Sequence, residues 1–166
     1  MTEALRLIHY SKTPLLKAQS RKHSDERCGA YKTPGLWFSV EGEDDWIAWC
    51  KGERFALESF VCATEIVLKP DHNVHQLKNA AEIDRFTREF TPLNAPEWDH
   101  SLDWPAVRKR WRGLIIAPYC WARRLERHTS WYYGWDCASG VIWDADAIAE
   151  LRAVEPPDMT LKEEAA

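Results

Sequence analysis

The chain has 166 residues, of which 45% are hydrophobic and 29% are charged, and its formal net charge is −4 at pH 7. This size and hydrophobic content suit one domain around one buried core, and the negative charge argues against a general polyanion binder. There is neither a basic-then-apolar leader nor an apolar run of bilayer length, so we expect a cytoplasmic protein without membrane contact.

The first predicted element is a strand at residues 5–10, which is rich in strand-forming side chains and stops before Pro14. His9 therefore lies near the C-terminal end of this strand. Residues 18–34 are polar and basic and end in a Thr-Pro-Gly turn signal, which predicts a surface loop leading into the next strand.

An aromatic strand at residues 36–40, followed at once by a helix, is the most informative stretch. Period-two alternation puts Trp37 and Ser39 on one face of the strand. Trp49 lies on the apolar stripe of the helix, so Trp37 and Trp49 can approach each other beside the Ser39 hydroxyl. Such an arrangement suits a flat ligand ring. The alternative is that both tryptophans belong to the core.

The remaining elements are predicted from periodicity and capping residues. Strands are predicted at residues 59–68, 114–117, 130–135 and 140–143. Helices are predicted to begin after Asp44 or Asp45, at Ala80, after Ser101 or Asp103, and after Asp144 or Asp146, the last continuing through Ile148 and Leu151. We assign residues 1–153 to one domain and residues 154–166 to a C-terminal tail.

Metal and thiol chemistry find little support in the sequence. His72 and His75 can be two metal ligands beside Asp71, but no second cluster completes a shell, so we expect a loop or helix surface and no metal. The five cysteines are scattered without C-x-x-C spacing, which argues against a disulfide framework. Cys137 is a weak candidate nucleophile, since no histidine is near it in the sequence.

A basic segment spans residues 108–127 and is interleaved with tryptophans. In such a segment arginines can contact phosphates and tryptophans can stack on bases, whereas the alternative is a solvated helix face. A nucleic-acid partner would be met through Arg108, Arg110, Arg112, Arg123 and Arg124. The chain has ten tryptophans, which indicates a ligand or partner surface without naming the partner.

Three segments together resemble the ADP-ribosyltransferase fold, on the diphtheria-toxin and poly(ADP-ribose) polymerase side of that family. Ile8-His9-Tyr10-Ser11 is similar to the strand that carries the family's His, Gly and Ser or Thr, with Tyr in place of Gly. Gly35-Leu36-Trp37-Phe38 and Trp49-Cys50 are similar to its Gly-x-Tyr-Phe motif and second Tyr, with Trp replacing Tyr both times. Gly140-Val141-Ile142-Trp143-Asp144, followed by Ala147-Ile148, is similar to its last active-site strand.

The resemblance implies an α+β single domain with two small, packed, mostly antiparallel sheets and flanking helices. It also implies a mono-ADP-ribosyltransferase that uses NAD+ as a co-substrate, modifies a protein or nucleic acid and releases nicotinamide. The compact size suits a bacterial or phage effector or toxin. Breaking the nicotinamide glycosidic bond develops an oxocarbenium-like sugar, which a fixed, dry pocket can orient.

The same resemblance implies a set of NAD+-binding residues. His9 would hydrogen-bond the nicotinamide ribose, and the backbone of Tyr10, followed by Ser11, would hold the carboxamide. Trp37 and Trp49 would sandwich the nicotinamide ring, which agrees with the stacking argument made from the spacing, in which Ser39 holds the polar edge of the ring.

The family's catalytic glutamate would fall at Ser139, which is a departure from the pattern. A serine can hydrogen-bond a hydroxyl but cannot stabilise a developing cation or deprotonate an acceptor. Asp136 is the nearest carboxylate and can reach the site if the chain bends at Gly134 or is bulged. The alternative for Asp136 is a capping or turn aspartate.

Three functions therefore remain open from the sequence. The first is the transferase. The second is a non-catalytic relative that binds NAD+ or an ADP-ribose-like nucleotide as a sensor or sponge, which Ser139 favours. The third is a tryptophan-rich interaction protein whose resemblance is accidental.

Overall fold

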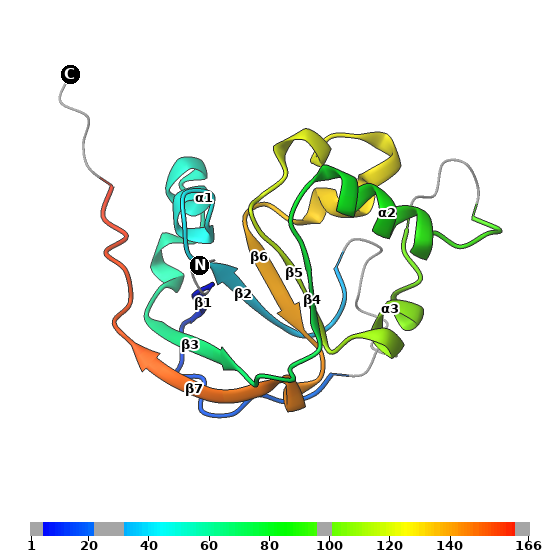
Figure 1. The fold of residues 1–166 in the computed structure, drawn as a ribbon. Helices are drawn as coiled ribbons and strands as arrows, with labels where there is room; N and C mark the ends of the chain where they lie inside the picture. The colour runs from blue at the N-terminus through cyan, green and yellow to red at the C-terminus, as the bar shows by residue number, and fades with distance from the viewer. Residues whose placement is uncertain (1–4, 22–31, 96–100, 162–166) are drawn as a thin grey trace, which may run out of the picture.

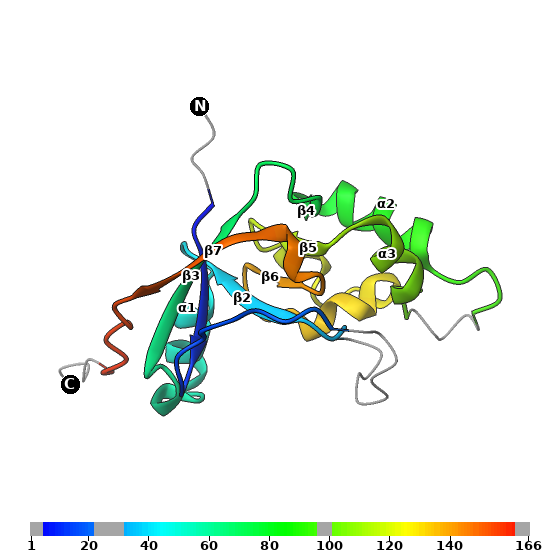
Figure 2. The same ribbon diagram turned by 90° about the horizontal axis from the view of Figure 1, so that it is seen from below.

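The computed structural model describes residues 5–21, 32–95 and 101–161. The fold is α+β, as expected, and its centre is a mixed, strongly twisted seven-stranded sheet with the strand order β4-β5-β6-β2-β1-β3-β7 (Figures 1 and 2). The strands are β1 (Leu7–Ser11), β2 (Leu36–Val40), β3 (Cys62–Leu68), β4 (Val74–Leu77), β5 (Gly113–Ile116), β6 (Ser139–Ile142) and β7 (Ile148–Val154).

One continuous sheet replaces the two packed sheets that we expected. In the described part of the chain, all strand pairings are antiparallel except the parallel pairing of β4 with β5. The expectation of a mostly antiparallel arrangement is confirmed, whereas the expectation of two separate sheets is wrong. The reason is that β1 and β2 keep a short hydrogen-bonded connection between the two halves of the sheet.

Three α-helices occur in the described residues, and each starts at a capping side chain. They are α1 (Trp46–Glu53), α2 (Ala80–Phe90) and α3 (Trp104–Arg110). Asp45 accepts from the Ala48 amide at 2.8 Å, and Asp103 accepts from the Ala106 amide at 3.0 Å, so both predicted caps are confirmed. These bonds satisfy amide groups that the first turn of a helix leaves unpaired.

Two sequence predictions are wrong, and a third is right except for where its strand begins. Residues 130–135 are not a strand, because residues Arg127–Gly134 form 3-10 helix with Trp131 and Tyr132 both buried. Residues 148–151 are not helical, because β7 occupies Ile148–Val154 and pairs with β3. The strand expected from residue 59 begins at Cys62, after a 3-10 turn at Leu57–Ser59. Strand β4 was not predicted.

The core lies between the β4-β5-β6 side of the sheet and a layer made of α2, α3 and the 3-10 segment Arg127–Gly134 (Figure 1). Trp131 is fully buried and donates from its indole nitrogen to Thr87 Oγ1 at 2.8 Å. No helix in the described ranges is long and apolar enough to cross a membrane.

An ion-pair cluster fixes α2 to the chain that precedes β6. Arg123 donates to both carboxylate oxygens of Asp84, at 2.7 and 2.8 Å, and His128 lies 3.1 Å from the same carboxylate. The hydrogen bonds from Arg123, with the contribution of His128, lower the pKa of Asp84 to about 2. The Asp84 carboxylate therefore stays charged and holds this segment in place over a wide pH range.

The close approach of β2 and β6 generates a first prediction. A methyl group at Gly140 would lie 2.4 Å from the Phe38 ring and 2.8 Å from the Leu114 carbonyl oxygen. Gly140→Ala should therefore lower the free energy of unfolding by about 1–3 kcal/mol, measured from urea denaturation.

Gly52→Ala is the matched control for that substitution. Gly52 lies in α1, and a methyl group there meets no other part of the protein within 4 Å. The control should leave stability unchanged or raise it by up to about 1 kcal/mol. Equal effects of the two substitutions would contradict the packing of Phe38 on Gly140.

Candidate functional site

The candidate site opens where β1 and β2 stop pairing. The two strands share only the register pairs Leu7 with Val40 and Ile8 with Ser39. Beyond Ile8, β1 continues along β3 as far as Ser11, whereas β2 remains paired with β6 from Leu36 to Ser39. The strands therefore diverge, and a cavity lies in the gap.

The cavity has a volume of about 220 Å³. This is below the roughly 300–1,000 Å³ typical of sites that enclose a drug-sized ligand, so it suits a ring with a small attachment. The lining residues are Ile8, His9, Tyr10, Lys32, Trp37, Phe38, Ser39, Trp46, Gly134, Asp136, Cys137 and Ser139. Six predicted site residues are among them, and Ser11 and Trp49 are not.

His9 bridges the diverging strands. Its Nδ1 lies 2.7 Å from the carbonyl oxygen of Trp37, and because a carbonyl can only accept, Nδ1 is the protonated nitrogen. In the neutral imidazole, Nε2 is then left with a lone pair that can accept a hydrogen bond. The side chain thus replaces the missing backbone pairing and sets its own tautomer.

Two tryptophans from different elements line the cavity. The indole nitrogen of Trp37 donates to the Thr33 carbonyl at 3.2 Å, and its ring meets Trp135 edge-on at 4.8 Å. Trp46, at the start of α1, is stacked on Trp49 with the ring centroids 4.8 Å apart and the planes 8° apart. These contacts hold both cavity-lining rings from outside the cavity.

The expected partnership of Trp37 with Trp49 is corrected by this geometry. Trp46 lines the cavity, and Trp49 lies behind it as the second ring of the stack. Helical spacing places both rings on one side of α1, but the way the helix docks on the sheet decides which ring reaches the cavity. Ser11 is also outside, and its hydroxyl donates to the Thr13 carbonyl at 2.7 Å.

Two buried serines lie side by side in the cavity lining, because Ser39 of β2 and Ser139 of β6 are register partners. Ser39 Oγ accepts from the amide of Trp46 at 2.9 Å, so its own proton is available for donation. Ser139 Oγ donates to the Cys137 carbonyl at 2.9 Å, so it retains lone pairs that can accept. The pair can therefore offer one donor and one acceptor to a ligand.

Asp136 is the one carboxylate among the described lining residues. Arg124 approaches its Oδ1 at 3.2 Å, and the same guanidinium lies over the rings of Trp121 and Tyr133. The sequence left two routes by which Asp136 could reach the site, a bend at Gly134 or a bulge. Asp136 does line the cavity, and the residues before it form neither a strand nor a bulge. The end of the 3-10 segment at Gly134 delivers it there.

Tyr10 and Lys32 complete the polar lining. Burial raises the pKa of Tyr10 to about 12, so its phenol keeps its proton, and its ring packs against Phe60 at 5.0 Å. Lys32 is exposed and its ammonium lies 5.1 Å from the centre of the Trp37 ring. Lys32 and Trp46 were missed from the sequence, although Trp46 shares the helical stripe of Trp49.

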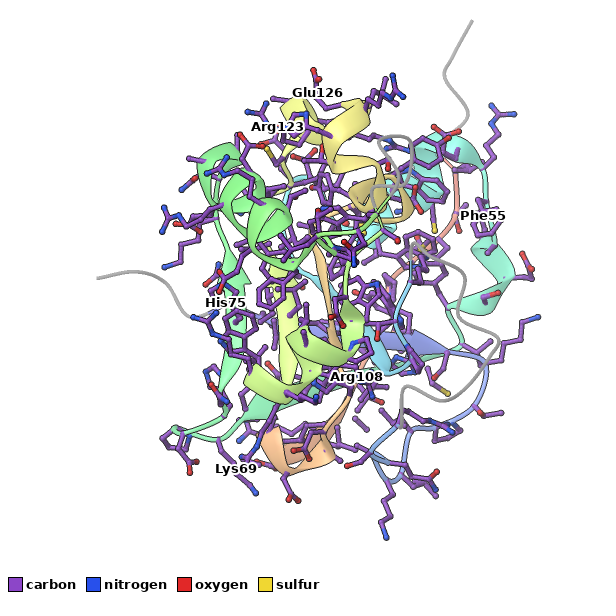
Figure 3. The ribbon with its side chains drawn as sticks, turned by 90° about the vertical axis from the view of Figure 1, so that its right-hand side faces the viewer. Phe55, Lys69, His75, Arg108, Arg123 and Glu126 are labelled. Atoms are coloured by element: carbon purple, nitrogen blue, oxygen red, sulfur yellow. The ribbon has the colours of Figure 1, made fainter. Side chains whose placement is uncertain are left out.

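The basic segment does not form a single cationic patch. Figure 3 shows Arg108 and Arg123 at well-separated places on the molecule. Four of its arginines form ion pairs with the chain's own carboxylates: Arg110 with Glu89, Arg112 with Asp144, Arg123 with Asp84 and Arg124 with Asp136. Arg108 donates to Thr33 Oγ1 and to the Pro34 carbonyl. These five arginines are thus engaged by groups of the chain itself.

Several of the tryptophans are core residues. In the described ranges, which leave out Trp98, only Trp121 is exposed, and four are buried: Trp104, Trp131, Trp135 and Trp143. The other four in these ranges, Trp37, Trp46, Trp49 and Trp111, are half-buried. His75, considered as a metal ligand, is stacked on Trp111 at 4.2 Å, and the described residues contain no group of three metal-binding side chains.

Comparison with known proteins gave no match to a family model, to a curated protein or to a solved structure.

The cavity thiol generates a second prediction. Burial raises the pKa values of Cys50 and Cys137 to about 12, so at pH 8 only about one thiol in ten thousand is ionised. Both should resist iodoacetamide in the native protein, whereas the partly exposed Cys62 and Cys120 react.

Mass spectrometry of the labelled peptides measures these reactivities, with the urea-unfolded protein as the control in which all five cysteines of the chain react. Rapid native labelling of Cys137 would contradict its assignment as an inert thiol and reopen nucleophilic catalysis.

Proposed function

We propose that the protein transfers ADP-ribose from NAD+ to a macromolecular acceptor and releases nicotinamide. One observation carries the proposal: residues 8–10, residues 37–39 and the set Asp136, Cys137 and Ser139, which belong to or adjoin the three segments that resemble the ADP-ribosyltransferases, line one cavity although they are far apart in the sequence. An accidental resemblance gives no reason for these segments to meet.

In the proposed complex, the nicotinamide ring lies between Trp37 and Trp46, where stacking on two large aromatic rings favours binding of a planar group. The cavity volume of about 220 Å³ admits this end of the dinucleotide, and the remainder extends outward. Lys32, at the exposed side, can then face the negative pyrophosphate. His9 Nε2 accepts a hydrogen bond from a hydroxyl of the nicotinamide ribose.

The proposed reaction breaks the bond between nicotinamide and the ribose, and the bonding electron pair leaves with nicotinamide. Positive charge develops on the sugar, and the acceptor's nucleophile then attacks the same carbon. Asp136 can stabilise this charge and take the acceptor's proton, as the one carboxylate among the described lining residues. Ser139 accepts from a ribose hydroxyl.

A second candidate function is binding of NAD+ or a related nucleotide without turnover. Two contacts favour it. Ser139 is committed to the Cys137 carbonyl, and Arg124 partly neutralises Asp136. Since neither group is a free carboxylate, the cavity can recognise a nucleotide and still lack the charge that drives bond cleavage.

The two functions are separated by measuring nicotinamide release and NAD+ binding on the same protein. For the transferase, we expect purified protein with a lysate as the source of acceptor to release nicotinamide, detected by mass spectrometry, and His9→Ala to abolish the release. A binding titration run in parallel detects capture without turnover. Absence of both in a folded sample would contradict both functions.

Trp37→Ala tests the stacking contact. Loss of one aromatic wall should weaken NAD+ binding by about 1–3 kcal/mol, or roughly 5- to 150-fold in Kd. Trp121→Ala is the matched control, because Trp121 is exposed and does not line the cavity. Calorimetric titration measures both, and circular dichroism checks the fold. Equal binding by the two variants would remove Trp37 from the site.

Asp136→Asn tests the proposed chemistry. The amide keeps the shape and loses the charge, so nicotinamide release should fall by about 100-fold or more while NAD+ affinity changes little. Arg124→Gln should leave binding intact and alter turnover only through the position of Asp136. Unchanged turnover in Asp136→Asn would exclude the carboxylate from the mechanism.

A further inference from the structure

The edge strand β7 presents an unpaired side to solvent. β7 ends the strand order after β3, and Figures 1 and 2 show it at the margin of the sheet. Among the described residues, no backbone hydrogen bond joins β7 to a second strand. A seven-residue edge with free amide and carbonyl groups is a template for pairing with another strand.

The sequence of β7 is complementary to its own reverse, with apolar residues opposite apolar residues and an acidic residue opposite a basic one. It reads Ile-Ala-Glu-Leu-Arg-Ala-Val, centred on Leu151. If a second β7 lies antiparallel to the first with Leu151 facing Leu151, then Glu150 faces Arg152 of the other copy, and Arg152 faces its Glu150. The pairing of β7 with β3 shifts register between Glu150 and Ile148, so the regular centre of the facing pairs is residues 150–152; beyond it alanine faces alanine and isoleucine faces valine. Every pair is therefore chemically matched.

Charge fixes this register. If the pairing slips by one residue to either side of the centre, Glu150 or Arg152 lies opposite a residue without a complementary charge. If Glu150 is centred, it faces Glu150 of the other copy, and if Arg152 is centred, two arginines meet. Like charges directly opposite each other destabilise a strand pair, so the Leu151-centred register is selected.

The neighbouring strands continue the same pattern. On β3, Glu65 is the register partner of Arg152, and Ile66 is the register partner of Leu151. Across the paired edge, the charged face would therefore alternate from Glu65 to Arg152 to Glu150 of the other copy. The opposite face would carry Ile66, Leu151 and their counterparts as a continuous apolar row.

From these observations we propose that the protein forms a symmetric homodimer through antiparallel pairing of β7 with β7 of a second copy. The occupant of the edge is a second copy because the charge pattern is complementary to itself. Within one strand Arg152 donates to Glu150 at 2.7 Å, and in the dimer each of these groups would also face its opposite charge on the other copy. The interface repeats the same contacts on both copies, as a two-fold axis requires.

The dimer goes beyond the proposed activity and does not depend on it. The cavity lies between β1 and β2, and β3 separates β1 from β7, so both cavities remain open in the dimer. One strand from each copy is a small interface, and we expect reversible association in the micromolar range rather than a permanent assembly.

The test is analytical ultracentrifugation of the full chain over a concentration series, with charge reversals on β7. The wild type should show a concentration-dependent dimer. Arg152→Glu and Glu150→Arg should each raise the dimer Kd by about 10- to 100-fold, because both facing pairs become repulsive. The double variant, with the two charges exchanged, should restore the wild-type Kd to within about threefold.

Mixing the two single variants gives the sharpest result. A strand with two glutamates then meets a strand with two arginines, so an equimolar mixture should dimerise although each variant alone is monomeric. Arg85→Glu, an exposed arginine on α2, is the matched control and should behave as the wild type. Circular dichroism confirms that each variant is folded.

Two outcomes would overturn the proposal. A wild type that stays monomeric over the whole series shows that the charges of β7 act only to prevent edge association. A dimer that is indifferent to the reversals, or a mixture that does not associate, shows that another surface carries the contact.

Discussion

The divergence of β1 from β2 is the constraint on which the site depends. Two register pairs keep the strands together as far as Ile8, and the His9 side chain then binds the Trp37 carbonyl in place of the next backbone hydrogen bond. Because that carbonyl accepts only, the interaction fixes the tautomer of His9 as well as its position. The divergence of β1 from β2 thus explains the gap in the sheet, the orientation of the His9 imidazole and the location of Trp37.

The walls of the cavity are held by groups outside it. Ser39 connects β2 to α1 by accepting the Trp46 amide, and Phe38 packs on Gly140 so closely that a larger residue has no room there. The ion pair of Arg124 with Asp136 ties the remaining wall to the segment before β6. Since each wall has support of its own, the cavity is formed before any ligand arrives, which favours binding of a rigid ring.

The sequence predicts the elements whose local signals agree with their burial. Alternation locates β2, and the aspartate caps locate α1 and α3. It fails where tertiary packing overrides the local signal. Trp131 and Tyr132 are adjacent and both buried in a 3-10 segment, but a central strand such as β5 also buries adjacent residues, so the apolar run alone does not distinguish the two. In β7, the register shift beside β3 brings Ile148 and Leu151, which are three residues apart, against the core. The strand therefore has the apolar spacing of a helix.

The cavity follows the same rule. Trp37 and Ser39 are predicted from strand alternation, whereas the choice of Trp46 over Trp49 depends on how α1 docks, which no local pattern encodes.

The arginine pairs have a consequence for association kinetics. A segment that reads as strongly basic is largely neutralised by Asp84, Glu89, Asp136 and Asp144, so it creates little long-range potential. A partner that meets any of these separate places (Figure 3) is not steered toward it by charge. Its association rate constant should lie near the unsteered range of about 10⁵–10⁶ M⁻¹s⁻¹ and vary little with ionic strength. Selection between partners at these places then depends on the dissociation rate constant of each complex.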